Sequence, residues 1–182
     1  MMEKYALFAV FQAFRKTMAE ESMRSLSRKA KVSVSTAKNC IDYLYSKKIL
    51  TRKIVGKQHQ YALNEESFLT RQLKIAANAG EISDSGLVEE ISKEYPDVQS
   101  IVWYGSTAKG LDSPKSDVDV VLLSRKPLKI KPLKAEERLA RELSISSYTM
   151  QEWRKKALTD KAYYDAVIID GICIFGEMPV VN

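Results

Sequence analysis

The chain has 182 residues, of which 45% are hydrophobic and 29% are charged, and its formal net charge at pH 7 is +6. This composition supplies enough apolar side chains for packed cores, and the length allows one large domain or two small ones. No apolar run approaches the roughly 20 residues of a membrane-spanning helix, and no signal-peptide cleavage pattern is present, so we expect a cytoplasmic protein without a membrane partner.

Charge divides the chain into two halves. Residues 1–80 contain 15 Lys or Arg and 6 Asp or Glu, which gives a net charge of +9, whereas residues 81–182 contain 14 and 17, which gives −3. A strongly basic half joined to a slightly acidic half indicates two domains, and a polyanion as the partner of the first.

Three helices and a hairpin are expected in the basic half. Apolar residues recur at helical spacing in three segments, which predicts helices over Lys4–Met18, Met23–Ala30 and Val34–Lys47. A serine at position 33 or 35 would cap the third helix. Two short extended runs then predict a β-hairpin over Thr51–Val55 and Gln58–Leu63.

This order of elements resembles a winged helix-turn-helix domain over about residues 5–65. The likeness is carried by Val32–Ala37 (VSVSTA) and by a basic hairpin that closes on Tyr61–Asn64 (YALN). It departs at Lys31, where the family commonly has glycine in the turn between the helices. The resemblance implies that the helix starting at Val34 enters the major groove of duplex DNA and that the hairpin meets phosphates or the minor groove. The implied DNA contacts are Ser35, Thr36, Lys38, Asn39, Arg52, Lys53 and Lys57. A basic protein–protein module is the alternative.

The next segment connects the halves. Residues Glu66–Ala79 are expected to form a helix that could link domains, pack on the first helix or pair with a second subunit in a homodimer. The polar segment Gly80–Gly86, with glycine at both ends, is expected to be a domain boundary.

The most informative motif follows the strand predicted at Val98–Tyr104. The run Gly105–Gly110 (GSTAKG) is small and polar, and after a short loop comes Ser116–Asp119 (SDVD). Glycine lets a phosphate approach the backbone, and the hydroxyl and amides of the following turn would face the same anion. Because side chains alternate along a strand, Asp117 and Asp119 project together, and a divalent cation is the usual relief for two such carboxylates.

The motif resembles the nucleotidyltransferase superfamily of DNA polymerase beta, especially its minimal prokaryotic members. The matched positions are Gly105, Ser106, Ala108, Lys109, Gly110, Ser116, Asp117 and Asp119. The ending Asp170–Gly176 (DGICIFG) is also similar, so the likeness covers residues 87–177. The implied fold class is α+β, with a winged helix-turn-helix domain followed by a small nucleotidyltransferase-fold α/β domain with a mixed sheet. The expected division is 1–65 for the first domain, 66–86 for a linker helix and hinge, and 87–182 for the nucleotidyltransferase-like domain.

The resemblance implies a chemistry. Asp117 and Asp119 would be catalytic and would hold Mg²⁺, with room for a two-metal site. The residues implied to bind a nucleoside triphosphate are Gly105, Ser106, Lys109 and Ser116. A nucleoside monophosphate would pass from the triphosphate to an acceptor hydroxyl, and pyrophosphate would leave.

One expected residue is missing. The family usually has a third acid on the strand after the next helix, where this chain has Ser144 and Ser146, neither of which is a strong base. Glu142 shares parity with Ser144 and could substitute if the strand begins early. Two functions therefore stay open: a nucleotidyltransferase that modifies a protein such as a toxin partner, or another acceptor such as an antibiotic; and a DNA-binding transcriptional regulator whose second domain only binds nucleotide or a partner.

Overall fold

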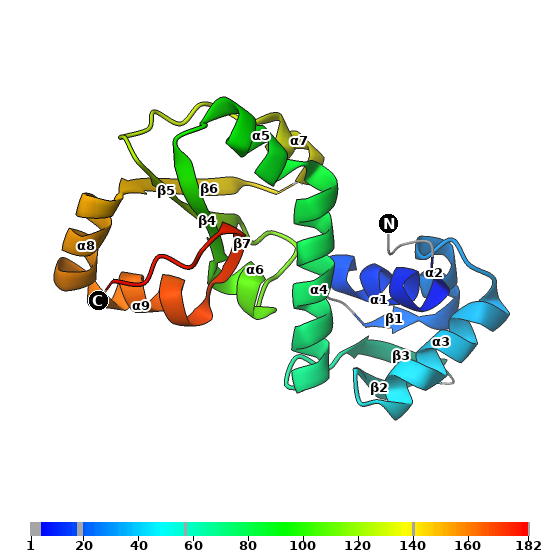
Figure 1. Ribbon diagram of the computed structural model, residues 1–182. Coiled ribbons are helices and arrows are strands. Elements are labelled where there is room, and N and C mark those ends of the chain that lie inside the picture. Colours follow the sequence, from blue (N-terminus) through cyan, green and yellow to red (C-terminus); the bar gives the residue numbers. More distant parts are fainter. Residues whose placement is uncertain (1–4, 18–19, 57, 140, 182) are drawn as a thin grey trace. The chain divides into compact units, whose positions relative to one another are not determined.

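The computed structural model describes residues 5–17, 20–56, 58–139 and 141–181 (Figure 1). It divides into two compact units, Met1–Gly80 and Glu81–Asn182. In the described residues, no helix is both long and apolar enough to cross a bilayer.

The first unit contains helices packed on a small antiparallel sheet whose strand order is β1-β3-β2. Its elements are α1 (Ala6–Thr17), β1 (Glu21–Ser22), α2 (Met23–Lys29), α3 (Val34–Ser46), β2 (Leu50–Val55) and β3 (Gln58–Leu63), followed by the first part of α4 (Phe68–Ser85). The three helices and the hairpin lie where periodicity predicted them. The short strand β1, which pairs with β3, was not predicted.

Helix α3 shows why the sequence folds this way. The Ser33 hydroxyl accepts a hydrogen bond from the amide of Thr36, so Ser33 rather than Ser35 is the N-cap. Ala37, Ile41 and Leu44 then recur on one face and are almost fully buried. Burial of a large aliphatic side chain contributes about 1.5–3 kcal/mol, so this face holds α3 in the core.

Two lysines of this unit have left-handed backbone conformations. Lys31, in the turn between α2 and α3, has φ 54°, and Lys48, just after α3, has φ 59°. A residue with a Cβ pays about 1–2 kcal/mol there, which explains why related turns favour glycine.

Helix α4 extends further than the sequence suggested. The segment expected to be a polar boundary from Gly80 is helical as far as Ser85, so the division between the units falls inside α4. Ile82 is 4% exposed and continues the apolar face. The Ser85 hydroxyl donates to the carbonyl of Ile82 and accepts from the amide of Leu87, which ends the helix at Gly86.

The second unit is built on a mixed four-stranded sheet of order β6-β5-β4-β7, as expected. Strand β4 is antiparallel to both β5 and β7, whereas β5 and β6 are parallel. Its elements are α5 (Leu87–Glu94), β4 (Val98–Tyr104), α6 (Gly105–Lys109), β5 (Val118–Ser124), α7 (Lys134–Leu139), β6 (Leu143–Thr149), α8 (Met150–Thr159), α9 (Lys161–Asp170) and β7 (Ile172–Gly176).

Helices cover both faces of this sheet, with α5 and α7 on one side and α8 and α9 on the other (Figure 1). On the α8 and α9 side, Val121 and Leu123 of β5 pack with Trp153 and Val167. Both tryptophans of the chain lie in this unit and are fully buried. The indole of Trp103 donates to the Thr107 hydroxyl at 2.8 Å, and that of Trp153 donates to the carbonyl of Pro179 at 2.8 Å.

Candidate active site

The sheet register brings the motif residues to one end of β5. Asp119 lies opposite Tyr104 of β4 on one side and opposite Ser144 of β6 on the other. Strand β5 begins at Val118, so Asp117 stands just before the strand rather than inside it, and it is exposed while Asp119 is half-buried. The two carboxylates are near enough for the charge of Asp117 to act on Asp119.

Gly105 makes this arrangement possible. Its φ is 80°, and a Cβ on it would lie 2.3 Å from Oδ2 and 3.1 Å from Cγ of Asp119. A side chain at this position would therefore collide with the carboxylate. The sequence predicted that glycine here admits a phosphate; the structure adds that it also admits Asp119.

The surroundings of Asp119 disfavour the charged form of its carboxyl group. Burial raises the pKa of its carboxyl, the charge of Asp117 raises it further, and a hydrogen bond from the Ser144 hydroxyl opposes the shift. The pKa of Tyr104 is also raised, mainly by burial and in part by the charge of Asp119. A cation at this point would relieve the repulsion between the carboxylates.

The third position of the site is occupied by hydroxyls. Ser144 is exposed and faces Asp119, whereas Ser146 is hydrogen-bonded to Tyr148 and Tyr163. The carbonyl of Glu142 accepts from the amide of Val118 at 2.9 Å. Within the described ranges, no group of three His, Cys, Asp or Glu side chains is arranged to hold a metal.

The loop between the glycine turn and the carboxylates is anchored by Arg141. Its guanidinium donates to the Asp112 carboxylate at 3.0 Å and to the carbonyls of Ser113 at 3.3 Å and Ser116 at 3.1 Å. The side chains of Arg141 and Asp112 are only 9% and 1% exposed. This buried pair fixes the position of Asp117, and sequence reasoning missed it because charged residues 29 positions apart carry no local signal.

Two predicted nucleotide contacts have protein partners. The ammonium of Lys109 lies 3.1 Å from a carboxylate oxygen of Asp170 at the end of α9. The Ser116 hydroxyl accepts from the amide of Ser113 at 2.9 Å and so shapes the loop. Ser106 is half-buried at the start of the five-residue helix α6, next to Gly105.

A group of tyrosines forms a wall beside the carboxylates. Tyr104 and Tyr148 share the Asp119 face of the sheet, and Tyr163 of α9 packs against both. The Tyr104 hydroxyl donates to that of Tyr163 at 3.4 Å, and burial raises the pKa of Tyr163 to about 12. These tyrosines were not predicted, although strand parity with Asp119 would have placed Tyr104 and Tyr148 on its face.

The predicted DNA contacts lie on the surface of the first unit. Ser35, Lys38 and Asn39 are exposed near the start of α3, and Thr36 is half-buried and hydrogen-bonded to Ser33. On the hairpin, the guanidinium of Arg52 lies over the Tyr45 ring at 4.7 Å, and Lys53 lies 3.4 Å from Glu20. Lys57 is outside the described residues.

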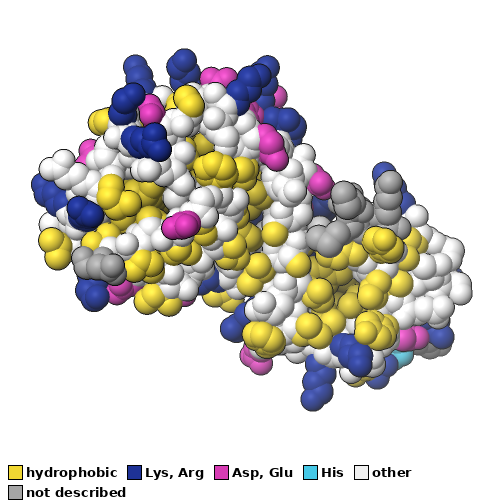
Figure 2. Space-filling view, in the orientation of Figure 1, with side chains coloured by type: hydrophobic (Ala, Val, Ile, Leu, Met, Phe, Trp, Pro, Cys, Tyr) yellow, Lys and Arg dark blue, Asp and Glu magenta, His cyan; other side chains and the backbone are white. Residues whose placement is uncertain are grey.

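The first unit also exposes apolar side chains, which gather over its helices in Figure 2. They border a groove of about 540 Å³ between α1, α3 and the start of α4. Its exposed apolar lining residues are Tyr5, Leu7, Tyr43 and Leu69. Of the predicted DNA contacts that the structure describes, none lines this groove.

Comparison with known proteins gives one positive result. Residues 85–168 match the family model of the nucleotidyltransferase domain, from the last residue of α4 into α9. No curated protein and no solved structure matches the chain significantly. The second unit is therefore similar to a nucleotidyltransferase domain over these residues, which supports that part of the resemblance found in the sequence.

Proposed function

We propose that the second unit transfers a nucleoside monophosphate from a nucleoside triphosphate to an acceptor hydroxyl, with release of pyrophosphate. The observation that carries this proposal is the pair Asp117 and Asp119 beside the Gly105 turn, inside the segment that matches the nucleotidyltransferase domain. Such a pair is needed because the reaction gathers negative charge at the α-phosphorus.

The donor set fits Mg²⁺. Mg²⁺ takes oxygen ligands and is commonly held by one or two carboxylates together with substrate phosphates, and the crowding of Asp119 by Asp117 favours a bound cation. Asp117 and Asp119 would hold it, and when bound it would offset charge on the triphosphate. Gly105 and Ser106 would receive the phosphates, and Lys109 would add a positive charge by leaving Asp170.

Calorimetric titration of a non-hydrolysable triphosphate, with and without Mg²⁺, tests the proposal. The double variant Asp117→Asn, Asp119→Asn should abolish the Mg²⁺-dependent part of binding. Asp97→Asn is the matched control, because Asp97 is an acid of the same unit that pairs with Lys126 on the surface. Equal affinity in the double variant and the control would refute the assignment of the site.

A second function is favoured by one observation, the hydroxyl of Ser144 opposite Asp119. Without a third acid, the unit would bind nucleotide and transfer it slowly, as expected for a regulator with a degenerate domain. Ser144→Asp would then raise pyrophosphate release by about a hundredfold or more, since general-base help is worth that much. Turnover in the native protein that is lost on Glu142→Gln would instead assign the third acid to Glu142.

We also propose that the first unit binds duplex DNA as a winged helix. Its net charge of +9 and the exposed Lys38 and Asn39 on α3 support this proposal. Gel shifts of the full chain should weaken with salt and with Lys38→Ala combined with Arg52→Ala. A full chain that shows no shift at low salt would leave protein–protein contact, with a protein acceptor, a toxin or a second copy, as the role of this unit.

A further inference from the structure

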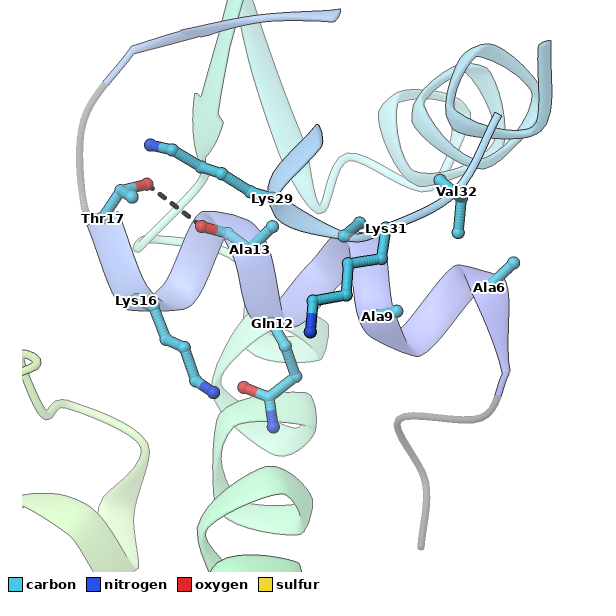
Figure 3. Close-up of a pocket in the computed structure, with 10 residues that line it drawn as sticks. Ala6, Ala9, Gln12, Ala13, Lys16, Thr17, Lys29, Lys31 and Val32 are labelled. Atoms are coloured by element: carbon cyan, nitrogen blue, oxygen red, sulfur yellow. Dashed lines mark hydrogen bonds between the residues drawn. The ribbon is translucent and has the colours of Figure 1, made fainter. Parts of the chain in front are cut away.

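A cavity of about 570 Å³ lies in the first unit between α1 and the turn that joins α2 to α3 (Figure 3). Among the described residues, none of those named above as contacts for DNA or nucleotide lines it. Cavities of roughly 300–1,000 Å³ with an apolar wall and a few polar groups are typical of small-molecule sites.

The apolar wall is made of small side chains. Ala6, Ala9 and Ala13 line the cavity from one side of α1, and Ala30 and Val32 line it from the turn. Small apolar side chains at these positions leave space between α1 and the turn. Such a wall favours a ligand with an apolar body.

The polar part of the lining is cationic. Lys16, Lys29 and Lys31 all contribute, but Lys29 is paired with Glu21 and Lys16 is also engaged in an interaction. Lys31 extends along α1 toward Gln12 in Figure 3, and its ammonium has no hydrogen-bond or ion-pair partner in the part of the chain that the structure describes. The carboxamide of Gln12, which is 5% exposed, is itself oriented by a hydrogen bond from Nε of Arg15 at 2.7 Å. The described residues that line the cavity include no acid.

The backbone of Lys31 adds an independent observation. Its φ of 54° is a conformation in which glycine is favoured, yet the chain places a long cationic side chain there. A residue kept in an unfavourable conformation is a reason to look for a function of its side chain. Here that side chain reaches the cavity.

We propose that this cavity binds a small organic anion with an apolar body, and that Lys31 is its charged contact. The ring system would lie against the alanines of α1, and the anionic group would meet the ammonium of Lys31. The ligand would then contact the turn that leads directly into α3.

The experiment uses the full chain and two fluorescent probes that differ in charge. 1-Anilinonaphthalene-8-sulfonate carries a sulfonate, and N-phenyl-1-naphthylamine has the same rings without it. Lys31→Gly removes the ammonium and also relieves the backbone. Lys48→Gly is the matched control, because Lys48 has the same kind of conformation, with φ 59°, and does not line the cavity.

We expect Lys31→Gly to bind the sulfonate probe about five- to tenfold more weakly, as for loss of one charge-assisted contact, and to bind the neutral probe unchanged. Both variants should have a Tm about 2–4 °C above that of the native chain, because glycine relieves the left-handed backbone conformation. Weaker binding would then not result from unfolding. The proposal is overturned if Lys31→Gly keeps its affinity for the sulfonate probe, if both probes weaken together, or if Lys48→Gly weakens the sulfonate probe equally.

Discussion

The two units hold their functional candidates in opposite ways. In the second unit Asp119 is pressed against Gly105, and the loop before Asp117 is locked by the buried pair of Arg141 and Asp112. In the first unit Lys38 and Lys53 are 62% and 67% exposed and make only surface ion pairs. Chemistry at one atom requires side chains fixed by their neighbours, whereas attraction to a polyanion requires only charge at the surface.

This contrast has a measurable consequence. Substitutions in the second unit should change stability and activity together, because the site residues are also packing residues. Substitutions of the basic surface should change binding alone. Substitutions in both units test that distinction.

Arg141→Met should destabilise the second unit by about 3–5 kcal/mol, because it removes the guanidinium that is paired with the buried Asp112 carboxylate. Urea unfolding measures the loss. Arg138→Met is the matched control: this arginine is 52% exposed in its pair with Glu90, so the cost should stay below about 1 kcal/mol. Equal costs for the two variants would show that the loop is not anchored by Arg141.

Gly105→Ala should cost about 1–2 kcal/mol from its left-handed backbone and should also displace the Asp119 carboxylate. Mg²⁺-dependent triphosphate binding should therefore disappear. Gly56→Ala separates the two effects, since Gly56 has φ 61° but open space around its Cβ position, so only the backbone cost remains. Retained nucleotide affinity in Gly105→Ala would contradict the proposed geometry.

Asp119→Asn should raise the Tm at pH 7. The folded state raises the pKa of this carboxyl above its ordinary value of 3.8, so its contribution to stability is complete below that value and is lost as the pH rises through the folded pKa. The variant avoids that loss, and its advantage should vanish near pH 3.8 and below. Thermal scans across this pH range measure the difference in Tm between the variant and the native chain. A lower Tm for Asp119→Asn at neutral pH would contradict a raised pKa of Asp119 in the folded state.

Lys53→Ala should leave stability within about 0.5 kcal/mol, because its ion pair with Glu20 is on the surface. If Lys53 contacts a DNA phosphate, the slope of log K against log[salt] should become shallower by about 0.9. Filter binding at several salt concentrations measures it. An unchanged slope would remove Lys53 from the proposed DNA surface.

A feature could be predicted from the sequence when it depends on residues that are close together along the chain. The helices of the first unit and the strands around Asp119 depend on local periodicity, and they were found. The pairing of Ser144 with Asp119 depends on which strands become neighbours, and it was not predicted. The family resemblance indicated only that Ser144 and Ser146 occupy the likely positions of the third acid. The Arg141 anchor could not be found, because a buried ion pair and two solvated charges look the same in sequence.

Helix α4 shows a different limit. Residues Gly80–Ser85 are polar enough to look like a linker, but one buried residue, Ile82, is sufficient to continue the helical face. The glycine at position 105 was predicted for its effect on a ligand, whereas its nearest steric partner is within the protein. In both cases the local composition was compatible with the prediction, but contacts with residues elsewhere in the fold determined the structure.

The placement of the two tryptophans supplies the molecule with its own reporter. Trp103 and Trp153 are both buried in the second unit, and the first unit contains no tryptophan. Tryptophan fluorescence therefore follows the unfolding of the second unit alone. Trp103 is also tied to Thr107 in the short helix that begins at Gly105. Its emission should therefore register a triphosphate arriving at that turn, without any label attached to the protein.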